Sequence, residues 1–129
     1  MRKPIIAGNW KMNLKIAEGV ALVEALKPLV ADVDNVEVVV CPMYTALDAV
    51  AKAAAGSNVQ VGAQNAYVKA SGAYTGEISP QFLQDAGCAW VIIGHSERRH
   101  ILGETDALLN EKLRFALAAG MKVMFCIGE

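Results

Sequence analysis

The sequence predicts an α/β fold, because short apolar runs typical of strands alternate with stretches that have helical periodicity. The apolar runs recur roughly every 20 to 35 residues, which is the spacing of strand–helix–strand units. They contain few polar residues, a pattern typical of parallel strands that are covered on both faces. The five predicted strands are Ile5 to Asn9, Val36 to Cys41, Val59 to Ala63, Ala89 to Gly94 and Val123 to Gly128.

Capping residues, glycines and a proline mark the ends of four helices between these strands. A proline lacks the amide hydrogen that a helix interior needs, and a hydroxyl can cap the first turn. The predicted helices run from Ile16 to a stop or kink at Pro28, from a cap at Thr45 to near Gly56, from a cap at Ser79 to near Gly87, and from a cap at Thr105 to near Gly120. In the last helix, the residues expected on one apolar face are Leu108, Leu109, Leu113, Ala116 and Leu117.

Composition excludes several classes of protein. The 129 residues include 12 Lys and Arg and 13 Asp and Glu, so the chain lacks the basic excess of a nucleic-acid-binding domain. Apolar residues make up 54% of the chain, but no apolar run approaches the ~20 residues that cross a membrane as a helix. We therefore predict a single domain over residues 1–129, with neither a nucleic-acid nor a membrane partner.

The cysteines and the amino terminus indicate a cytoplasmic protein. Cys41, Cys88 and Cys126 are odd in number and lie in or beside apolar stretches, which suits reduced thiols. The apolar run after Arg2 and Lys3 ends too early for a signal peptide. The cysteines and histidines also lack the spacing of a metal site, so we predict no metal.

One connection is much longer than the rest. Residues 64–78 join a predicted strand to a predicted helix, where roughly two to six residues usually suffice. Long loops of this kind are often functional, although a disordered surface excursion is the alternative. Tyr67 and Tyr74 give the loop side chains that can pack, which favours the functional interpretation.

A flavodoxin-like domain is the main rival fold, because it also has five parallel strands. A phosphoacceptor domain of that kind needs carboxylates after its first and third strands to hold Mg²⁺. Here those strands end in Gly8-Asn9-Trp10 and Ala63-Gln64-Asn65. The strand ends therefore argue against this rival.

Polar residues follow the predicted strands at their carboxyl ends, where parallel α/β folds place their functional groups. His95 precedes a short helical segment, whose positive end favours an uncharged ring that can donate a hydrogen bond to a substrate oxygen. Lys11 offers a positive charge to an anionic substrate, and Asn9 offers an amide to orient it. The residues at these strand ends are Asn9, Lys11, Gln64, Asn65, His95, Ser96, Glu97 and Glu129. Together they predict a site for a small anion that carries a carbonyl group.

Six runs in the same order resemble the triosephosphate isomerase family. They are Gly8-Asn9-Trp10-Lys11-Met12-Asn13, Gly62-Ala63-Gln64-Asn65, Tyr74-Thr75-Gly76-Glu77-Ile78-Ser79, Gly94-His95-Ser96-Glu97-Arg98-Arg99, Gly103-Glu104-Thr105-Asp106 and Cys126-Ile127-Gly128-Glu129. The resemblance implies a (β/α)8 barrel that interconverts dihydroxyacetone phosphate and glyceraldehyde 3-phosphate through an enediol(ate), as an aldose-ketose isomerase of glycolysis and gluconeogenesis. It also implies a cytoplasmic homodimer without metal or organic cofactor.

By this resemblance, Asn9 and Lys11 bind the substrate, and Lys11 and His95 are catalytic. A neutral histidine in that role is an arrangement already described for this family. Glu97 and Ser96 are supporting residues, with Glu97 behind Lys11. The alternative for Glu97 is a glutamate that only stabilises the start of a helix.

The long loop resembles the dimerisation arm of the family. Its implied contact residues are Gln64, Asn65, Thr75 and Glu77, together with Arg98. Thr75 is expected to reach Asn9 and Lys11 of a second copy, and Glu77 to pair with Arg98 across the contact. The sequence departs from the usual family pattern at Met43 and Tyr44, where a proline and a phenylalanine are common.

The resemblance covers only about the first half of a barrel that takes roughly 250 residues. The base glutamate, the mobile lid and the phosphate-binding loops belong to the other half. We therefore expect the chain alone to be inactive and its first and fifth strands to be open edges. The alternative is a non-catalytic half-barrel scaffold that self-associates or complements the missing half.

Overall fold

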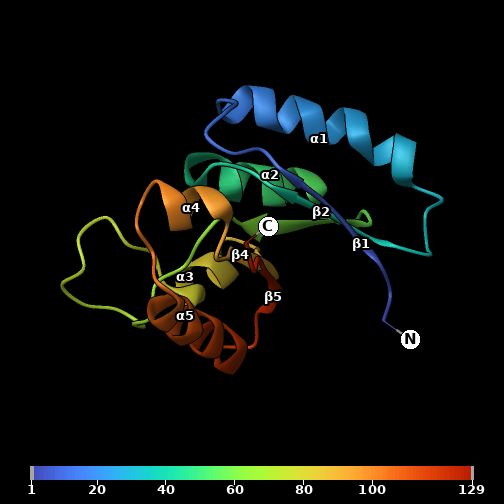
Figure 1. Ribbon diagram of the computed structural model, residues 1–129. Helices are drawn as coiled ribbons and strands as arrows, with labels where there is room; N and C mark the ends of the chain where they lie inside the picture. The colour runs from blue at the N-terminus through green and yellow to red at the C-terminus, as the bar shows by residue number, and fades with distance from the viewer. Residues whose placement is uncertain (1, 129) are drawn as a thin grey trace.

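The computed structural model describes residues 2–128, which form one sheet of five parallel strands. The strands are β1 (Ile5–Asn9), β2 (Glu37–Cys41), β3 (Val59–Ala63), β4 (Trp90–Ile93) and β5 (Lys122–Phe125). They lie in sequence order, each hydrogen-bonded to the next, so β1 and β5 are the two edges of the sheet. The sheet is curved (Figure 1). The prediction of five parallel strands in an α/β fold is confirmed.

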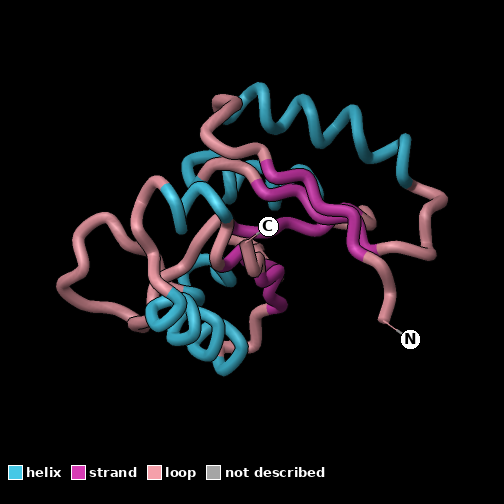
Figure 2. Tube along the Cα trace, viewed as in Figure 1, coloured by secondary structure: helices cyan, strands magenta, loops and turns pink. Residues whose placement is uncertain are grey.

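Helices occupy each of the four connections between strands, and α1, α2, α3 and α5 lie on the outside of the curved sheet (Figure 2). They are α1 (Ile16–Val30), the 3-10 helix η1 (Tyr44–Ala46), α2 (Leu47–Ala54), α3 (Pro80–Asp85), α4 (Ser96–His100) and α5 (Asp106–Ala118). Within residues 2–128, no helix has the length and apolar character needed to cross a membrane.

One predicted helix boundary is wrong, and of the two outcomes predicted at Pro28, a stop or a kink, the structure excludes the stop. Helix α1 continues past Pro28 to Val30, because Leu26 and Val30 both pack against the core and hold the last turn in place. Thr45 does not cap α2, since the chain already turns helical at Tyr44 and Ala46 occupies the capping position. In both places, tertiary contacts outweigh the local sequence signal.

The other helix ends agree with the sequence. Ser79 is the residue that precedes α3, although its hydroxyl makes no capping hydrogen bond. Thr105 caps α5 through its Oγ1, which accepts the Leu108 N–H at 3.3 Å. Gly120 follows the end of α5 with a φ of 89°, a conformation that glycine adopts without strain.

Strand β5 is shorter at its end than predicted. It pairs with β4 only as far as Phe125, opposite Ile93, although the Cys126 N–H still donates to the Ile93 carbonyl at 2.9 Å. Gly128 has a φ of 78°, which is incompatible with an extended strand. The expected continuation from Phe125 to Gly128 is therefore a loop.

Side chains alternate between two apolar clusters, one on each face of the sheet. The outer cluster packs strand residues such as Val40, Val61 and Ile93 against Leu83 and Leu109 of the helices. The inner cluster consists of Val39, Cys41, Trp90 and Ile92, with Met124 and Cys126 packed against it. Burial on both faces explains why the strand sequences are almost continuously apolar.

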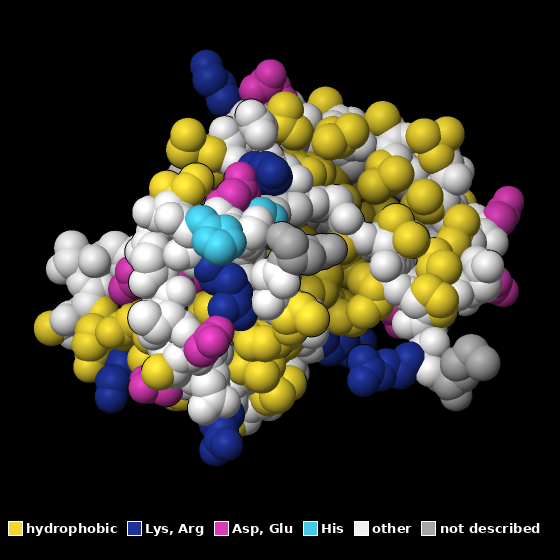
Figure 3. All heavy atoms as spheres, in the orientation of Figure 1, with side chains coloured by type: hydrophobic (Ala, Val, Ile, Leu, Met, Phe, Trp, Pro, Cys, Tyr) yellow, Lys and Arg dark blue, Asp and Glu magenta, His cyan; other side chains and the backbone are white. Residues whose placement is uncertain are grey.

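The edge strands lack this double cover. Ile6 of β1 is 63% exposed, and Phe125 of β5 is also exposed. An apolar hollow of about 380 Å³ runs beside β1 and is lined by Ile6, Leu22, Leu26 and Val38, among others. Figure 3 shows apolar side chains gathered over α1 and β1.

Candidate active site

The carboxyl ends of β1, β2, β3 and β4 surround a hollow of about 500 Å³. The polar side chains that line it include those of Asn9, Lys11, Gln64, His95, Glu97 and Arg98. Mostly apolar side chains also line it, among them Met12, Met43, Tyr44 and Leu102. The structure therefore gathers at one place six of the residues that the sequence singled out.

The backbone of Lys11 is strained and held from two sides. Its φ is 55°, in the left-handed region that residues with side chains rarely adopt. The Lys11 N–H donates to Asn9 Oδ1 at 3.0 Å, and Gln64 Nε2 donates to the Lys11 carbonyl at 2.8 Å. Gln64 also donates to the Cys41 carbonyl at 3.0 Å. Side chains from β1 and from the end of β3 thus fix the conformation of the loop that carries Lys11.

The ammonium group of Lys11 lies beside Glu97, with Nζ and Oε2 3.4 Å apart. Both side chains are about half exposed, so solvent screens the pair and its contribution to folding is small. The contact keeps the positive charge at the hollow without burying it. An anionic ligand can therefore still reach Lys11.

The ring of His95 is held by the helix that it precedes. His95 is the N-cap residue of α4, and its Nδ1 accepts the Glu97 N–H at 3.1 Å. Because Nδ1 accepts this hydrogen bond, it carries no hydrogen of its own. In a neutral ring the hydrogen is then on Nε2. Glu97 Oε1 also lies 3.3 Å from Nδ1. His95 and Lys11 therefore both contact Glu97.

A buried charged cluster behind the hollow was missed at the level of sequence. The Lys112 side chain is only 2% exposed, donates to Asn65 Oδ1 at 2.9 Å and pairs with Glu104. Glu104 Oε2 also pairs with Arg98 Nη2 at 3.2 Å. Lys112 lies three residues after Leu109 and four before Ala116, so its helical spacing could have placed it on the buried face.

This cluster shifts the ionisation of Glu104. Burial alone would raise the pKa of Glu104, but hydrogen bonds from Lys112 and Arg98, and the charges of both, outweigh it and hold the pKa below its ordinary value. Glu104 is therefore ionised at neutral pH and anchors Arg98. In this chain, the partner of the Arg98 guanidinium is Glu104, whereas the expected pairing with Glu77 concerns a second copy.

Tyr44 lines the hollow and is hydrogen-bonded to the start of the long loop. Its hydroxyl donates to the Asn65 carbonyl at 2.6 Å. Burial of that hydroxyl raises the pKa of Tyr44 above its ordinary value, so the group stays a donor. The tyrosine that departs from the usual family pattern therefore adds a hydrogen bond that a phenylalanine could not make.

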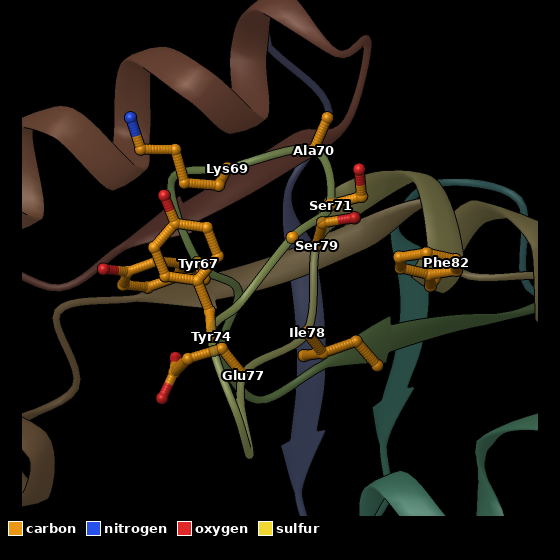
Figure 4. Close-up of a pocket in the computed structure, with 10 residues that line it drawn as sticks. Tyr67, Lys69, Ala70, Ser71, Tyr74, Glu77, Ile78, Ser79 and Phe82 are labelled. Atoms are coloured by element: carbon orange, nitrogen blue, oxygen red, sulfur yellow. The ribbon is translucent and has the colours of Figure 1, made fainter.

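The long loop folds around its own side chains. The rings of Tyr67 and Tyr74 lie 5.1 Å apart, and the Tyr67 N–H donates to the Ile78 carbonyl at 2.8 Å across the base of the loop. A small hollow of about 160 Å³ lies against the loop, with Phe82 of α3 in its wall (Figure 4). Thr75 and Glu77 are exposed on its outer part.

The remaining expected residues lie in different surroundings. Asn65 is buried and belongs to the Lys112 cluster rather than to the exposed part of the loop. Ser96 begins α4 but is not among the described residues that line the hollow. Glu129 lies outside the described residues. No group of three or more potential metal ligands occurs within residues 2–128.

Comparison with known proteins agrees with the arrangement of the strand ends. A family model described as triosephosphate isomerase matches residues 4–129. The chain belongs to the triosephosphate isomerase family. Curated triosephosphate isomerases from Clostridium novyi and Trichlorobacter lovleyi are 57% and 54% identical to it over 129 residues. These alignments cover 100% of this chain and 51% of each relative, so the chain spans about half the length of the curated relatives it matches.

A solved structure identifies which half of the triosephosphate isomerase fold is present. The crystal structure of triosephosphate isomerase from Bartonella henselae superposes with a TM-score of 0.92 and 38% sequence identity. The match covers 99% of this chain and 53% of that chain. The prediction of the amino-terminal half of a TIM barrel is therefore confirmed.

Proposed function

We propose that this chain supplies the substrate-binding and electrophilic half of a triosephosphate isomerase active site. The reaction interconverts dihydroxyacetone phosphate and glyceraldehyde 3-phosphate by proton transfer through an enediol(ate). The observation that carries the proposal is the meeting of Lys11 and His95 at one hollow, where both contact Glu97.

His95, Lys11 and Asn9 at the hollow have chemistry suited to this reaction. His95 Nε2–H donates to the carbonyl oxygen of the triose, which stabilises the negative charge that develops there. Lys11 attracts the phosphorylated substrate and adds a positive charge near the same oxygen. Asn9 contacts substrate and holds the Lys11 backbone, while Glu97 and Ser96 support the lysine and the start of α4.

Residues 1–129 by themselves are proposed to be inactive. Proton abstraction from carbon needs a positioned general base, which typically contributes about 10² to 10⁴-fold to the rate. Among the described residues that line the hollow, Glu97 is the only carboxylate, and it already contacts Lys11 and the Nδ1 side of His95. The base, and the loops that grip the phosphate, are assigned to the second half of the barrel.

A homodimer is part of the same proposal. The outer part of the long loop is exposed, and Thr75 on it can reach the Asn9 and Lys11 region of a second copy. Glu77 can then pair with Arg98, which lines the hollow. Met12 and Leu102 line the hollow and are exposed, so a contact between two copies could bury their apolar surface.

A second candidate is a non-catalytic half-barrel that self-associates or complements another half. The uncovered strands β1 and β5 favour it, because open edges of parallel strands readily pair with further strands. This candidate predicts association without turnover.

The two candidates are separated by completing the barrel. Residues 1–129 are joined to the carboxyl-terminal half of the Clostridium novyi relative, and triose phosphate isomerisation is followed in a coupled assay. The completed barrel should turn over, residues 1–129 alone should not, and His95→Gln should lower kcat by about 10² to 10⁴-fold. The matched control His100→Gln changes an exposed histidine away from the hollow and should leave kcat unchanged. Equal loss in both variants would contradict the role of His95.

A further inference from the structure

Arg99 makes three hydrogen bonds that join three separate segments. Its Nε donates to the Gly94 carbonyl at 2.9 Å, and its Nη2 donates to the Cys126 carbonyl at 2.9 Å. Its Nη1 donates to Asp106 Oδ1 at 2.6 Å. The Arg99 side chain is only 14% exposed and, unlike Arg98, is not among the described residues that line the hollow.

The two carbonyl groups belong to the ends of neighbouring strands that approach very closely. Gly94 has a φ of 81°, and a Cβ at that position would lie 2.7 Å from the Cys126 carbonyl oxygen. It would also lie 3.2 Å from Arg99 Nη2. Only a glycine fits here, and the guanidinium occupies the adjacent space with donors facing both carbonyls.

His95 directly follows Gly94, so these bonds fix the chain on one side of the histidine. On its other side, the His95 carbonyl accepts the N–H groups of Arg98 and Arg99 at 2.9 and 3.0 Å. Arg99 thus holds the residue before His95 through its side chain and His95 itself through its backbone.

We propose that Arg99 is a positioning residue for His95. It acts through its hydrogen bond to the Gly94 carbonyl, and its bond to the Cys126 carbonyl anchors the Gly94 turn to the end of β5. The inference rests on the proposed function, because it assigns a consequence for the reaction in which His95 takes part. Arg99 is not among the described residues that line the hollow, so we assign its effect to the placement of the ring.

The geometry requires an arginine. A guanidinium presents several N–H donors in a fixed plane and can serve two carbonyls and a carboxylate at once. A lysine at this position has a single point of attachment and can satisfy only part of the set. Arg99→Lys is therefore expected to rescue part of what Arg99→Met loses.

Asp106 provides a matched control. It accepts from the same guanidinium, but its side chain is 93% exposed, so the bond contributes little to the free energy of unfolding. Loss of this bond leaves the hydrogen bonds from Arg99 to both carbonyls in place. Asp106→Ala removes the accepting carboxylate altogether, and Asp106→Asn keeps an acceptor oxygen and removes only the charge. If Arg99 acts through the two carbonyls, both variants leave His95 undisturbed.

The test has a kinetic arm and a spectroscopic arm. In the completed barrel, Arg99→Met should lower kcat by about 10 to 100-fold with little change in KM, because a displacement near 1 Å can cost about 10²-fold. Arg99→Lys should fall between Arg99→Met and the parent, and Asp106→Asn should match the parent. In the 129-residue chain, nitrogen NMR of the His95 ring should show Nδ1 unprotonated in the parent and a changed Nδ1 signal in Arg99→Met.

The arms separate the inference from the function on which it rests. An unchanged His95 signal in Arg99→Met, or a kcat loss as large in Asp106→Asn, overturns the positioning role. A KM increase with kcat unchanged also overturns it, since that pattern indicates a ligand contact. If the completed barrel is inactive, the proposed function fails, and the His95 signal still decides whether Arg99 positions the ring.

Discussion

Strands β4 and β1 both deliver site residues, but they are supported in opposite ways. All four residues of β4 are buried, and Ile93 at its end is fully inaccessible. Most of β1 is exposed, with Ile6 at 63%. His95 therefore extends from the most protected part of the sheet, whereas Lys11 extends from an edge.

The difference shows that burial and site geometry are separable in this chain. Lys11 is held by a local hydrogen bond to Asn9 and by one from Gln64 at the end of β3, and not by apolar cover on its strand. His95 has polar bonds of the same kind and a buried strand beneath them. The β4 side of the site should therefore depend on the core, and the β1 side on side-chain hydrogen bonds.

The largest expected effect comes from the core under His95. Ile93→Ala removes a fully buried side chain and should lower the free energy of unfolding by about 2 to 5 kcal/mol. Ile6→Ala is the matched variant on β1 and should cost less than about 1 kcal/mol, because its side chain remains largely in water. Urea denaturation compares the two. Equal losses would show that β1 is covered in solution and would remove the contrast.

The buried charged cluster gives the next largest effect. Lys112→Met should lower the free energy of unfolding by roughly 1 to 3 kcal/mol, because Asn65 and Glu104 lose a donor while Glu104 keeps Arg98. Lys52→Met is the control, since its pair with Asp48 is exposed and worth under about 1 kcal/mol. The same urea titration measures both. A Lys112→Met protein as stable as its parent would show that the cluster is not needed to hold Asn65.

The same cluster predicts an acid sensitivity. The pKa of Glu104 in the folded chain lies below the ordinary value of a glutamate, so its stabilisation is present above that ordinary pKa and is lost as the pH falls through the lowered one. The parent should lose stability more steeply than Glu104→Gln as the pH is lowered through this range. Urea midpoints at a series of pH values give the two slopes. Identical slopes would mean that Glu104 has the same pKa in the folded and unfolded chains.

The smallest expected effect concerns the base of the long loop. Tyr44→Phe removes the hydrogen bond to the Asn65 carbonyl and should cost about 0.5 to 1.5 kcal/mol. Hydrogen exchange at residues 66–78 should accelerate while exchange in β4 stays unchanged. Faster exchange in β4 as well would show that the loop and the core open together.

Sequence reasoning succeeded where a pattern depends on local chemistry. The apolar runs located all five strands, and the cap at Thr105 located α5, because strand burial and capping are read from neighbouring residues. It failed at Thr45, and at Pro28 it did not decide between a stop and a kink, because contacts with the core decide how far a helix runs.

The sequence indicated which residues lie at the hollow, but not the hydrogen bonds that hold them there. Strand ends indicated Asn9, Lys11 and His95, since parallel strands bring their carboxyl ends to one edge. The bond from Gln64 to the Lys11 carbonyl and the cluster around Lys112 join residues far apart in sequence. No local pattern specifies such pairs, because each depends on the register between separate strands and helices.

The central claim is that Lys11 and His95 form one site for a small phosphorylated carbonyl compound. The most direct test titrates the 129-residue chain with dihydroxyacetone phosphate while NMR follows the Lys11 ammonium and the His95 ring nitrogens. The account predicts that both signals move with a common dissociation constant and that the His100 ring does not respond. Separate dissociation constants, or a response at only one of the two residues, would contradict it.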